Sequence, residues 1–440
     1  MTSFIRVVLF YFLSLLLISN GFLAVGITLV FELVYRLIFD SNRIFVFREW
    51  VLLLYSLNYV ISPLITYQLD DSVLNYGMKI PSDQYFTLAI PGLLAFMIGL
   101  YSLPTNIFTP NFKSIKKSAV VNETFLYRTT AVAVFLKFIY TFNLGELSLI
   151  VYLASLLRFV SAFALFSINP RKYLLLIVVV FSIDLVSSFI GGMYHDVVMW
   201  LIFFAFYYMY SIKPTVRLKI LGATAFVLFI LFLQAMKVVY RQEVWYGKKD
   251  ASLETVGEIG SQIADNEILL GDDNLMATLS RSNQAWIFAS TVDHMDRNKN
   301  FQGTTILSKY LEAAILPRFL APDKIKSGDK AIFNSFSGHE VNEGTSMGLG
   351  VFADGYIAYG IWGVYIFGLA LGLIFSLTFK LVESWAKISP FYILLMLPLL
   401  NYAVRPDCEL QTTITHLFKG GVLYGFLVYL SRKRFTLVTQ

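Results

Sequence analysis

Long apolar runs separated by short polar segments dominate the chain. After a first run that fills most of residues 1–38, ten further runs lie at 49–67, 84–103, 125–142, 147–167, 173–190, 194–212, 218–236, 350–379, 390–404 and 415–430. None alternates polar and apolar residues as a half-buried strand does, and continuous apolarity over such lengths is typical of membrane-spanning helices. The pattern therefore predicts an all-α, polytopic membrane protein with about eleven transmembrane helices.

The first apolar run is too long for a signal peptide and has no small-residue cleavage site. We interpret it as an uncleaved first span. Asn20 and Gly21 in its middle either kink this span or split it into a short re-entrant pair. A single span places the N-terminus outside, whereas a hairpin moves it inside.

Composition narrows the class further. Of the 440 residues 57% are hydrophobic and only 15% are charged, with a mean hydropathy of +0.66. Soluble domains carry roughly 25% charged residues, so a soluble multi-domain enzyme, a disordered chain and a fibrous repeat are excluded. The single cysteine, Cys408, rules out an intramolecular disulfide and a CxxC metal site. In a membrane protein the net charge of +6 reports orientation rather than nucleic-acid binding.

Lysine and arginine are unevenly divided between the two sets of alternating short loops. One set carries 16 of them and the other only Lys79 and Arg405. Because basic loops stay in the cytoplasm, the C-terminus is predicted to be cytoplasmic. The residues of the basic set are Arg36, Arg43, Arg48, Lys113, Lys116, Lys117, Arg171, Lys172, Lys213, Arg217, Lys219, Lys380, Lys387, Arg432, Lys433 and Arg434.

The same register divides the chain into spans 1–8 (1–237), a large external loop (238–345) and spans 9–11 with a cytoplasmic tail (346–440). Within the loop, 275–295 and 303–316 have helical periodicity, and Pro317 ends the second helix. Residues 247–273 are acidic and contain four glycines, so we expect a mobile loop there, and 323–345 reads as polar loop.

Three charged residues lie inside predicted spans, where an unpartnered charge costs several kcal/mol. They are Lys137, Arg158 and Asp184. One interpretation is an ion-pair staple between helices, and the other is the polar wall of a cavity.

A second polar group gathers by topology at the outer membrane face. Several arginines at that depth suit phosphate and pyrophosphate, which accept bidentate guanidinium contacts, whereas single residues there more often snorkel to the interface. The spans and short loops supply His195, Asp196, Lys237, Arg241, Arg405, Asp407, Glu409, His416 and Lys419, and the large loop supplies Arg281, Arg318, Lys324, His339 and Glu340.

Five segments resemble the Wzy-type polymerases that join oligosaccharide repeat units of bacterial surface polysaccharides. The most specific is the Thr/Ser entry to a span followed by an aromatic and paired glycines, within 344–363. The segments are FIGGMYHD (189–196), AMKVVYRQ (235–242), ILPRFLAP (315–322), GTSMGLGVFADGYIAYGIWG (344–363) and YAVRPDCE (402–409).

This resemblance implies a GT-C-like helical body related in fold to O-antigen ligases, in the bacterial cytoplasmic membrane. It implies transfer of a growing glycan from polyprenyl pyrophosphate to the terminal sugar of a new lipid-linked unit. The reaction is inverting, needs no metal or other cofactor, and involves membrane lipids and, as possible partners, the pathway's chain-length regulator and flippase. Matching arginines are Arg241, Arg318 and Arg405. The chain departs from the family pattern at His195, where an arginine is common, and at Asp354, where many relatives carry glutamate.

An inverting transfer needs a base for the acceptor hydroxyl and cations for the leaving pyrophosphate. We expect the base to be His339 or Glu340, with Asp354 as a further catalytic candidate. The pyrophosphate ligands are expected among Arg241, Arg405, Arg318, Arg281 and Lys419, and His195, Thr345 and His416 are expected to bind substrate. A ligase that moves finished glycan to another acceptor, a flippase for the lipid-linked unit, and a non-catalytic membrane subunit remain alternatives.

Overall fold

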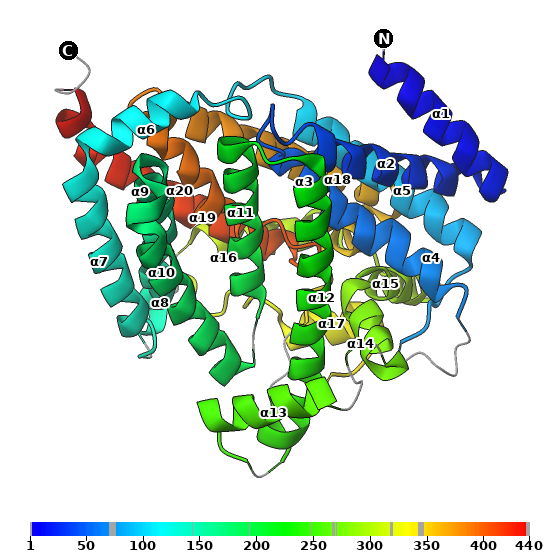
Figure 1. The fold of residues 1–440 in the computed structure, drawn as a ribbon. Coiled ribbons are helices and arrows are strands. Elements are labelled where there is room, and N and C mark those ends of the chain that lie inside the picture. Colours follow the sequence, from blue (N-terminus) through cyan, green and yellow to red (C-terminus); the bar gives the residue numbers. More distant parts are fainter. Residues whose placement is uncertain are drawn as a thin grey trace.

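In the computed structural model, every regular element of the described chain is a helix. The described residues are 2–69, 76–142, 144–192, 194–247, 249–265, 269, 271–316, 320–341 and 347–436. Most of the helices lie side by side in one bundle (Figure 1). The predicted all-helical fold is confirmed for these residues.

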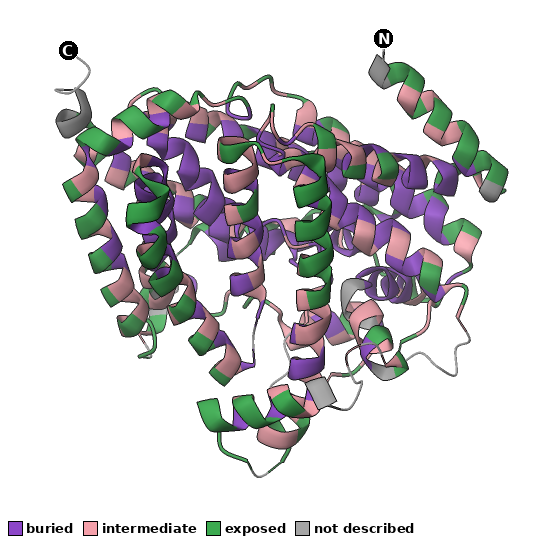
Figure 2. Cartoon of the chain, viewed as in Figure 1, coloured by how far each residue is buried: buried purple, intermediate pink, exposed green. Residues whose placement is uncertain are grey.

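Eight helical segments are long and apolar enough to cross a membrane. Many large apolar side chains point outward from them, as expected for helices that face lipid, and the outer surface of α12 is exposed along most of its length (Figure 2). The eight are α2 (Gly21–Phe39), Phe47–Thr66 made of α3 (Phe47–Ser56), η1 (Leu57–Ile61) and α4 (Ser62–Thr66), α5 (Ser82–Tyr101), Ser148–Ile168 made of α8 (Ser148–Ser155) and α9 (Leu157–Ile168), α10 (Pro170–Gly191), α11 (His195–Ile212), Val216–Trp245 made of α12 (Val216–Tyr240) and η4 (Arg241–Trp245), and α18 (Val351–Ala386).

The remaining expected spans form helices that fall outside this set of eight. Residues 125–142 lie mainly in α7, 390–404 in η6 and α19, and 415–430 in α20. The expected count of eleven therefore stays a prediction, while a helical polytopic membrane protein is the class that the fold defines. The bounds are α6 (Phe112–Val121), α7 (Glu123–Ile139), η3 (Gly145–Leu147), η6 (Pro390–Leu395), α19 (Met396–Leu400) and α20 (Leu410–Thr436).

The first apolar run is two helices, so the expectation of one continuous span is wrong. α1 (Thr2–Leu17) ends before Asn20, whose side chain caps α2 by accepting a hydrogen bond from the Leu23 amide at 3.0 Å. Arg6 pairs with Glu32 at 2.6 Å, and the Thr28 hydroxyl lies 3.4 Å from that of Ser14. Contacts in this descending order show that α1 and α2 run antiparallel, which is the hairpin alternative.

The expected span at 350–379 is also interrupted. Tyr359 and Gly360 have non-helical backbone angles, and the φ of Gly360 is +61°. The two parts fold against each other so closely that a Cβ on Gly363 would lie 1.8 Å from the Gly355 carbonyl oxygen. The amides of residues 302 and 303 donate hydrogen bonds to the carbonyls of residues 357 and 358 at 2.9 and 3.0 Å. These two bonds give partners to backbone carbonyl groups at the end of the first part of α18.

Glycines allow the longer part of α18 to pack directly on the backbone of α5. A Cβ on Gly99 would lie 2.3 Å from the Leu369 carbonyl oxygen, and one on Gly372 would lie 2.2 Å from that of Phe96. Small residues at such contacts let membrane helices approach closely and gain van der Waals contact. This packing holds α18, and with it the segment before α18, in a fixed position.

The large loop is mostly helical and lies at one end of the bundle. α13 and α14 are at the lower end of Figure 1, whereas α6 and the start of α1 are at the upper end. The helix expected at 303–316 is confirmed, whereas the one expected at 275–295 is divided by a break at Asn283–Gln284. Two segments expected to be loops also contain helices. α13 occupies part of the expected mobile loop, and α17 lies in the expected polar loop. The elements are α13 (Leu253–Asp265), α14 (Asp272–Ser282), α15 (Ala285–Asn298), α16 (Thr304–Ile315) and α17 (Lys330–Ser337).

The α5–α18 contact predicts that Gly372→Ala lowers the melting temperature of the protein in mild detergent. The added methyl group forces two backbones apart, and such overpacking costs about 1–3 kcal/mol. Gly222→Ala is the matched control, because nothing lies within 4 Å of a Cβ at that position of α12. Equal melting temperatures for the two variants would contradict the close packing.

Candidate functional site

A polar cavity of about 530 Å³ lies among α7, α8, α10, α11, the 401–409 segment and α20. It takes residues from the ends of these helices that point toward the large loop, and Ser327 of that loop also lines it. The lining residues are Lys137, Tyr140, Leu149, Tyr152, Asp184, Ser187, Ser188, His195, Asp196, Ser327, Tyr402, Arg405, Gln411, Thr412, Thr415 and His416.

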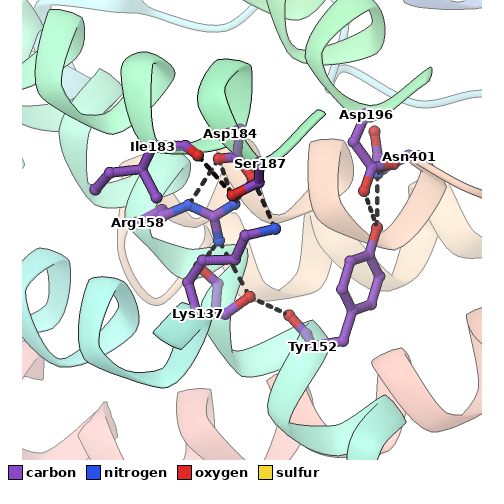
Figure 3. Close-up of polar contacts among 9 residues, drawn as sticks. Lys137, Tyr152, Arg158, Ile183, Asp184, Ser187, Asp196 and Asn401 are labelled. Carbon is purple, nitrogen blue, oxygen red and sulfur yellow. Dashed lines mark hydrogen bonds and ion pairs between the residues drawn. The ribbon is translucent and has the colours of Figure 1, made fainter. Parts of the chain in front are cut away.

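One wall of the cavity is built on an ion triad within the bundle (Figure 3). Arg158 donates to Asp184 from Nε at 3.1 Å and from Nη2 at 2.6 Å, and both side chains are almost fully buried. Lys137 reaches the same carboxylate at 3.0 Å. Both interpretations of these three charges hold, since Arg158 and Asp184 staple α9 to α10 while Lys137 and Asp184 face the cavity.

A second carboxylate, Asp196, is held at the start of α11. Tyr152 donates its hydroxyl hydrogen to Asp196 Oδ2 at 3.1 Å. Asn401 Nδ2 lies 3.4 Å from Asp196 Oδ1 and 3.2 Å from the Tyr152 hydroxyl oxygen, so the three groups form one small network (Figure 3). This network ties α8 and α11 to the segment that follows α19.

The Tyr402 ring contacts three of the predicted residues that line the cavity. The Arg405 guanidinium lies 4.7 Å from the centre of this ring, and the His416 ring stacks on it at 5.8 Å. The His195 ring meets it edge-on at 6.5 Å. Residues from α11, the 401–409 segment and α20, far apart in the sequence, therefore meet around one aromatic side chain.

His195 lines the cavity at the start of α11. Its Nε2 atom is buried and has no hydrogen-bond partner within the described ranges. In a neutral imidazole the unprotonated ring nitrogen carries a lone pair that can accept a proton. His416 differs, because its Nε2 lies 3.1 Å from the Pro398 carbonyl oxygen.

Arg405 is paired but only partly buried. Its Nε donates to Asp407 Oδ1 at 3.0 Å, and Nη2 donates to Oδ2. Burial is the largest single effect and would raise the pKa of Asp407. The charge and hydrogen bonds of Arg405, together with the smaller effects of His195 and a backbone hydrogen bond, outweigh burial and lower that pKa below its usual value. The third guanidinium nitrogen of Arg405, Nη1, has no hydrogen bond or ion pair to a described residue, and the Arg405 side chain is 25% exposed. The guanidinium can thus accept a further anionic partner.

The 401–409 segment is fixed by capping contacts from distant parts of the chain. Asp354 accepts a hydrogen bond from the Leu410 amide at 2.8 Å, at the first turn of α20, and another from the Tyr310 hydroxyl at 2.7 Å. Gly348 packs against the same segment, where a Cβ would lie 2.1 Å from the Asp407 carbonyl oxygen. Asp354 is completely buried and does not line the cavity. Its contacts position the 401–409 segment, and the expected catalytic role stays a prediction.

Two other expected catalytic residues also lie away from the cavity. His339 Nε2 is 3.0 Å from the Ser290 hydroxyl, and its ring meets Trp286 edge-on. Burial, and after it the charge of Lys79, lowers the pKa of His339 below its usual value. Glu340 follows His339 and is exposed, and neither residue lines the cavity.

The expected pyrophosphate ligands are not all brought together. Arg241 stacks over Trp245 at 4.4 Å, Trp245 packs near Gly192 at the end of α10, and Arg241 does not line the cavity. Lys419 is half-buried on α20 outside the lining set. Arg318 and Thr345 lie outside the described residues, and the side chain of Arg281 is likewise not described.

The cavity contains polar residues that sequence reasoning left unassigned. Tyr152 and Thr415 lie on predicted spans, and Gln411 and Thr412 lie in the short loop before the last span. None of the four carries a charge, so they gave no signal. Asp196 carried a signal as a charge at the start of a span. In the described part of the chain no group of three or more His, Cys, Asp or Glu side chains could hold a metal ion.

Comparison with known protein families assigns the chain to a family whose function is not described. The fold defines a helical, polytopic membrane protein. Residues 69–386, more than half of the chain, match a family described as a domain of unknown function, DUF8712, and the chain belongs to that family. No curated protein and no solved structure matches the chain.

The ion triad predicts that Asp184→Asn strongly destabilises the protein. The change leaves Arg158 charged and buried beside a neutral amide, and breaking a buried pair on one side costs about 3–5 kcal/mol. The double variant Arg158→Met/Asp184→Leu should recover much of the loss, because it removes both buried charges. Melting temperatures in detergent measure both effects.

Asp293→Asn is the control, since Asp293 pairs with Arg297 at the exposed surface of α15. Such pairs contribute about 0–1 kcal/mol. A loss for Asp184→Asn no larger than for Asp293→Asn would show that the triad does not stabilise the bundle.

Proposed function

We propose that this protein is a polymerase of lipid-linked oligosaccharide repeat units, an enzyme of the Wzy type with a GT-C-like body. The observation that carries the proposal is one cavity lined by both a half-buried guanidinium, Arg405, and an imidazole with a free Nε2, His195. Two segments of the family resemblance, 189–196 and 402–409, supply these two residues. A pyrophosphate and a sugar hydroxyl are the groups that such a pair suits.

The proposed reaction assigns one task to each residue. The acceptor hydroxyl oxygen bonds to the anomeric carbon of the donor sugar, while the bond between that carbon and the pyrophosphate oxygen breaks. The pyrophosphate leaves with the electron pair, still attached to its polyprenyl chain, and His195 Nε2 takes the hydroxyl proton. Arg405, with Lys137 across the cavity, stabilises the charge on the leaving group, as preorganised cations do in such reactions.

The proposal assigns the end of the bundle with α13–α17 to the external face of a bacterial cytoplasmic membrane. If α7, η6–α19 and α20 also cross, the eight candidate spans become eleven, and α1 adds a twelfth because α1 and α2 are antiparallel. Both termini are then cytoplasmic. A chain-length regulator and a flippase are the partners expected in the same pathway.

The proposed topology predicts that fluorescent proteins fused to either terminus fluoresce, because both fusions remain in the cytoplasm. A phosphatase inserted after Asn298, in the turn between α15 and α16, should be active outside. An active phosphatase at the C-terminus would contradict the orientation.

Arg405→Lys tests the proposed site, with the length distribution of the surface glycan as the measurement. Lysine keeps the charge but loses the planar fork that binds pyrophosphate through two hydrogen bonds. Loss of such a partner costs about 2–5 kcal/mol, which corresponds to tens- to thousands-fold in rate. We therefore expect severely shortened chains at a normal protein level.

Arg297→Lys is the matched control, an arginine paired with an aspartate on an exposed helix surface. Normal chain lengths in Arg405→Lys would contradict the proposal.

Deletion of the gene distinguishes the polymerase from the related activities. Single repeat units support a polymerase, accumulated long chains on lipid indicate a ligase, and units retained inside the cell indicate a flippase.

A further inference from the structure

An apolar groove of about 590 Å³ adjoins the polar cavity. It lies between α7, α9, η6 and α20, and Val132 at its edge is 58% exposed, so the groove opens to the lipid side of the bundle. On α7 the groove and the cavity are lined by consecutive residues, since Leu136 lines the groove and Lys137 lines the cavity.

The same order repeats on the two other walls. Along α8 and α9, Tyr152 lines the cavity and Ala154 already lines the groove. Along α20, Thr415 lines the cavity and Leu423 lines the groove, about 12 Å further along the helix at 1.5 Å per residue. Groove and cavity therefore share the walls formed by α7, α8 and α20 and follow one another along them, as the two parts of a site for an amphiphile would.

The length of the combined site discriminates between lipids. From Phe125 to Tyr140 it follows α7 for about 22 Å. One leaflet of the hydrocarbon core is about 15 Å thick, half of the whole core. An acyl chain of an outer-leaflet phospholipid ends near the middle of the bilayer, so filling the groove from a headgroup in the cavity requires a longer chain.

We propose that the groove binds the isoprenoid chain of a polyprenyl pyrophosphate whose pyrophosphate lies in the cavity beside Arg405. This inference rests on the proposed function and adds the place where the lipid of the substrate is held. Ala154 and Ala133 leave room between the helices for a chain with methyl branches. The other lining residues are mainly large and apolar, which excludes water from the chain, and the polar ones among them are Arg128, Thr129, Ser161, Tyr392, Tyr424 and Ser431.

The experiment measures binding of sugar-free undecaprenyl pyrophosphate and of geranyl pyrophosphate to the full-length protein in detergent. Ala154→Trp fills the groove at a half-exposed position. We expect this variant to bind undecaprenyl pyrophosphate at least about tenfold more weakly than the wild type, because several methylene groups of the chain are no longer buried. Geranyl pyrophosphate, whose short chain ends near the cavity, should bind as before. Ala225→Trp on the exposed face of α12 is the matched control and should change neither affinity.

Each other outcome has a distinct meaning. Unchanged undecaprenyl pyrophosphate binding by Ala154→Trp overturns the groove inference and leaves the proposed function standing. Phosphatidylglycerol that competes as well as undecaprenyl pyrophosphate also overturns it, because the groove is then a general lipid site. A wild-type protein that binds neither pyrophosphate contradicts the proposed function itself.

A second variant keeps the inference testable if Ala154→Trp does not fold. A photo-crosslinking amino acid at Val132 should capture undecaprenyl pyrophosphate. The same residue at Leu175, on the exposed face of α10, should not. Equal capture at both positions counts against the groove.

Discussion

A buried aspartate shared by two cations is the interaction on which the site depends. In a hydrocarbon environment Asp184 cannot remain charged without partners, and Arg158 and Lys137 come from two different neighbouring helices, α9 and α7. The pairing therefore fixes how three helices meet, and it places Lys137 and Asp184 in the cavity wall. Hydrophobic contact alone does not specify such a geometry, since lipid tails are as apolar as the helix surfaces they compete with.

The opposite wall is built on backbone that is not helical, which a membrane protein tolerates only where its polar groups find partners. The 401–409 segment meets this condition through contacts from elsewhere in the chain. The Asp354 carboxylate accepts a hydrogen bond from the first amide of α20, and the Tyr59 hydroxyl donates one to the Pro406 carbonyl at 3.4 Å. Gly350, whose φ is +83°, allows the backbone before α18 to reach the same place. The described part of the glycine-rich segment, residues 347–363, thus acts on the site by holding the 401–409 segment, with Arg405 and Tyr402, in position.

Sequence patterns predicted those features that depend on local order. Apolar runs located the helices, and charge within the runs identified Lys137, Arg158 and Asp184 as partners. The break at Tyr359–Gly360 escaped prediction because both halves of α18 are apolar, and only tertiary contact with residues 302–303 satisfies the interruption. His339 and Glu340 were placed near the site by topology, which assigns a membrane face but not a lateral position. His195, Arg405 and His416 share that face and also the cavity, a distinction that needs the contacts of α11 and α20 with the Tyr402 ring.

The two guanidinium–carboxylate pairs of the site differ in what it costs to break them. Arg158 and Asp184 are 1% and 3% exposed, and separating such a pair costs about 3–5 kcal/mol. Arg405 and Asp407 are 25% and 46% exposed, and exchanging partners in water costs about 1 kcal/mol or less. An anionic ligand of the proposed kind would therefore displace Asp407 from Arg405 at a lower cost than Asp184 from Arg158. The structure keeps one arginine as a fixed support of the bundle and leaves the other available for binding.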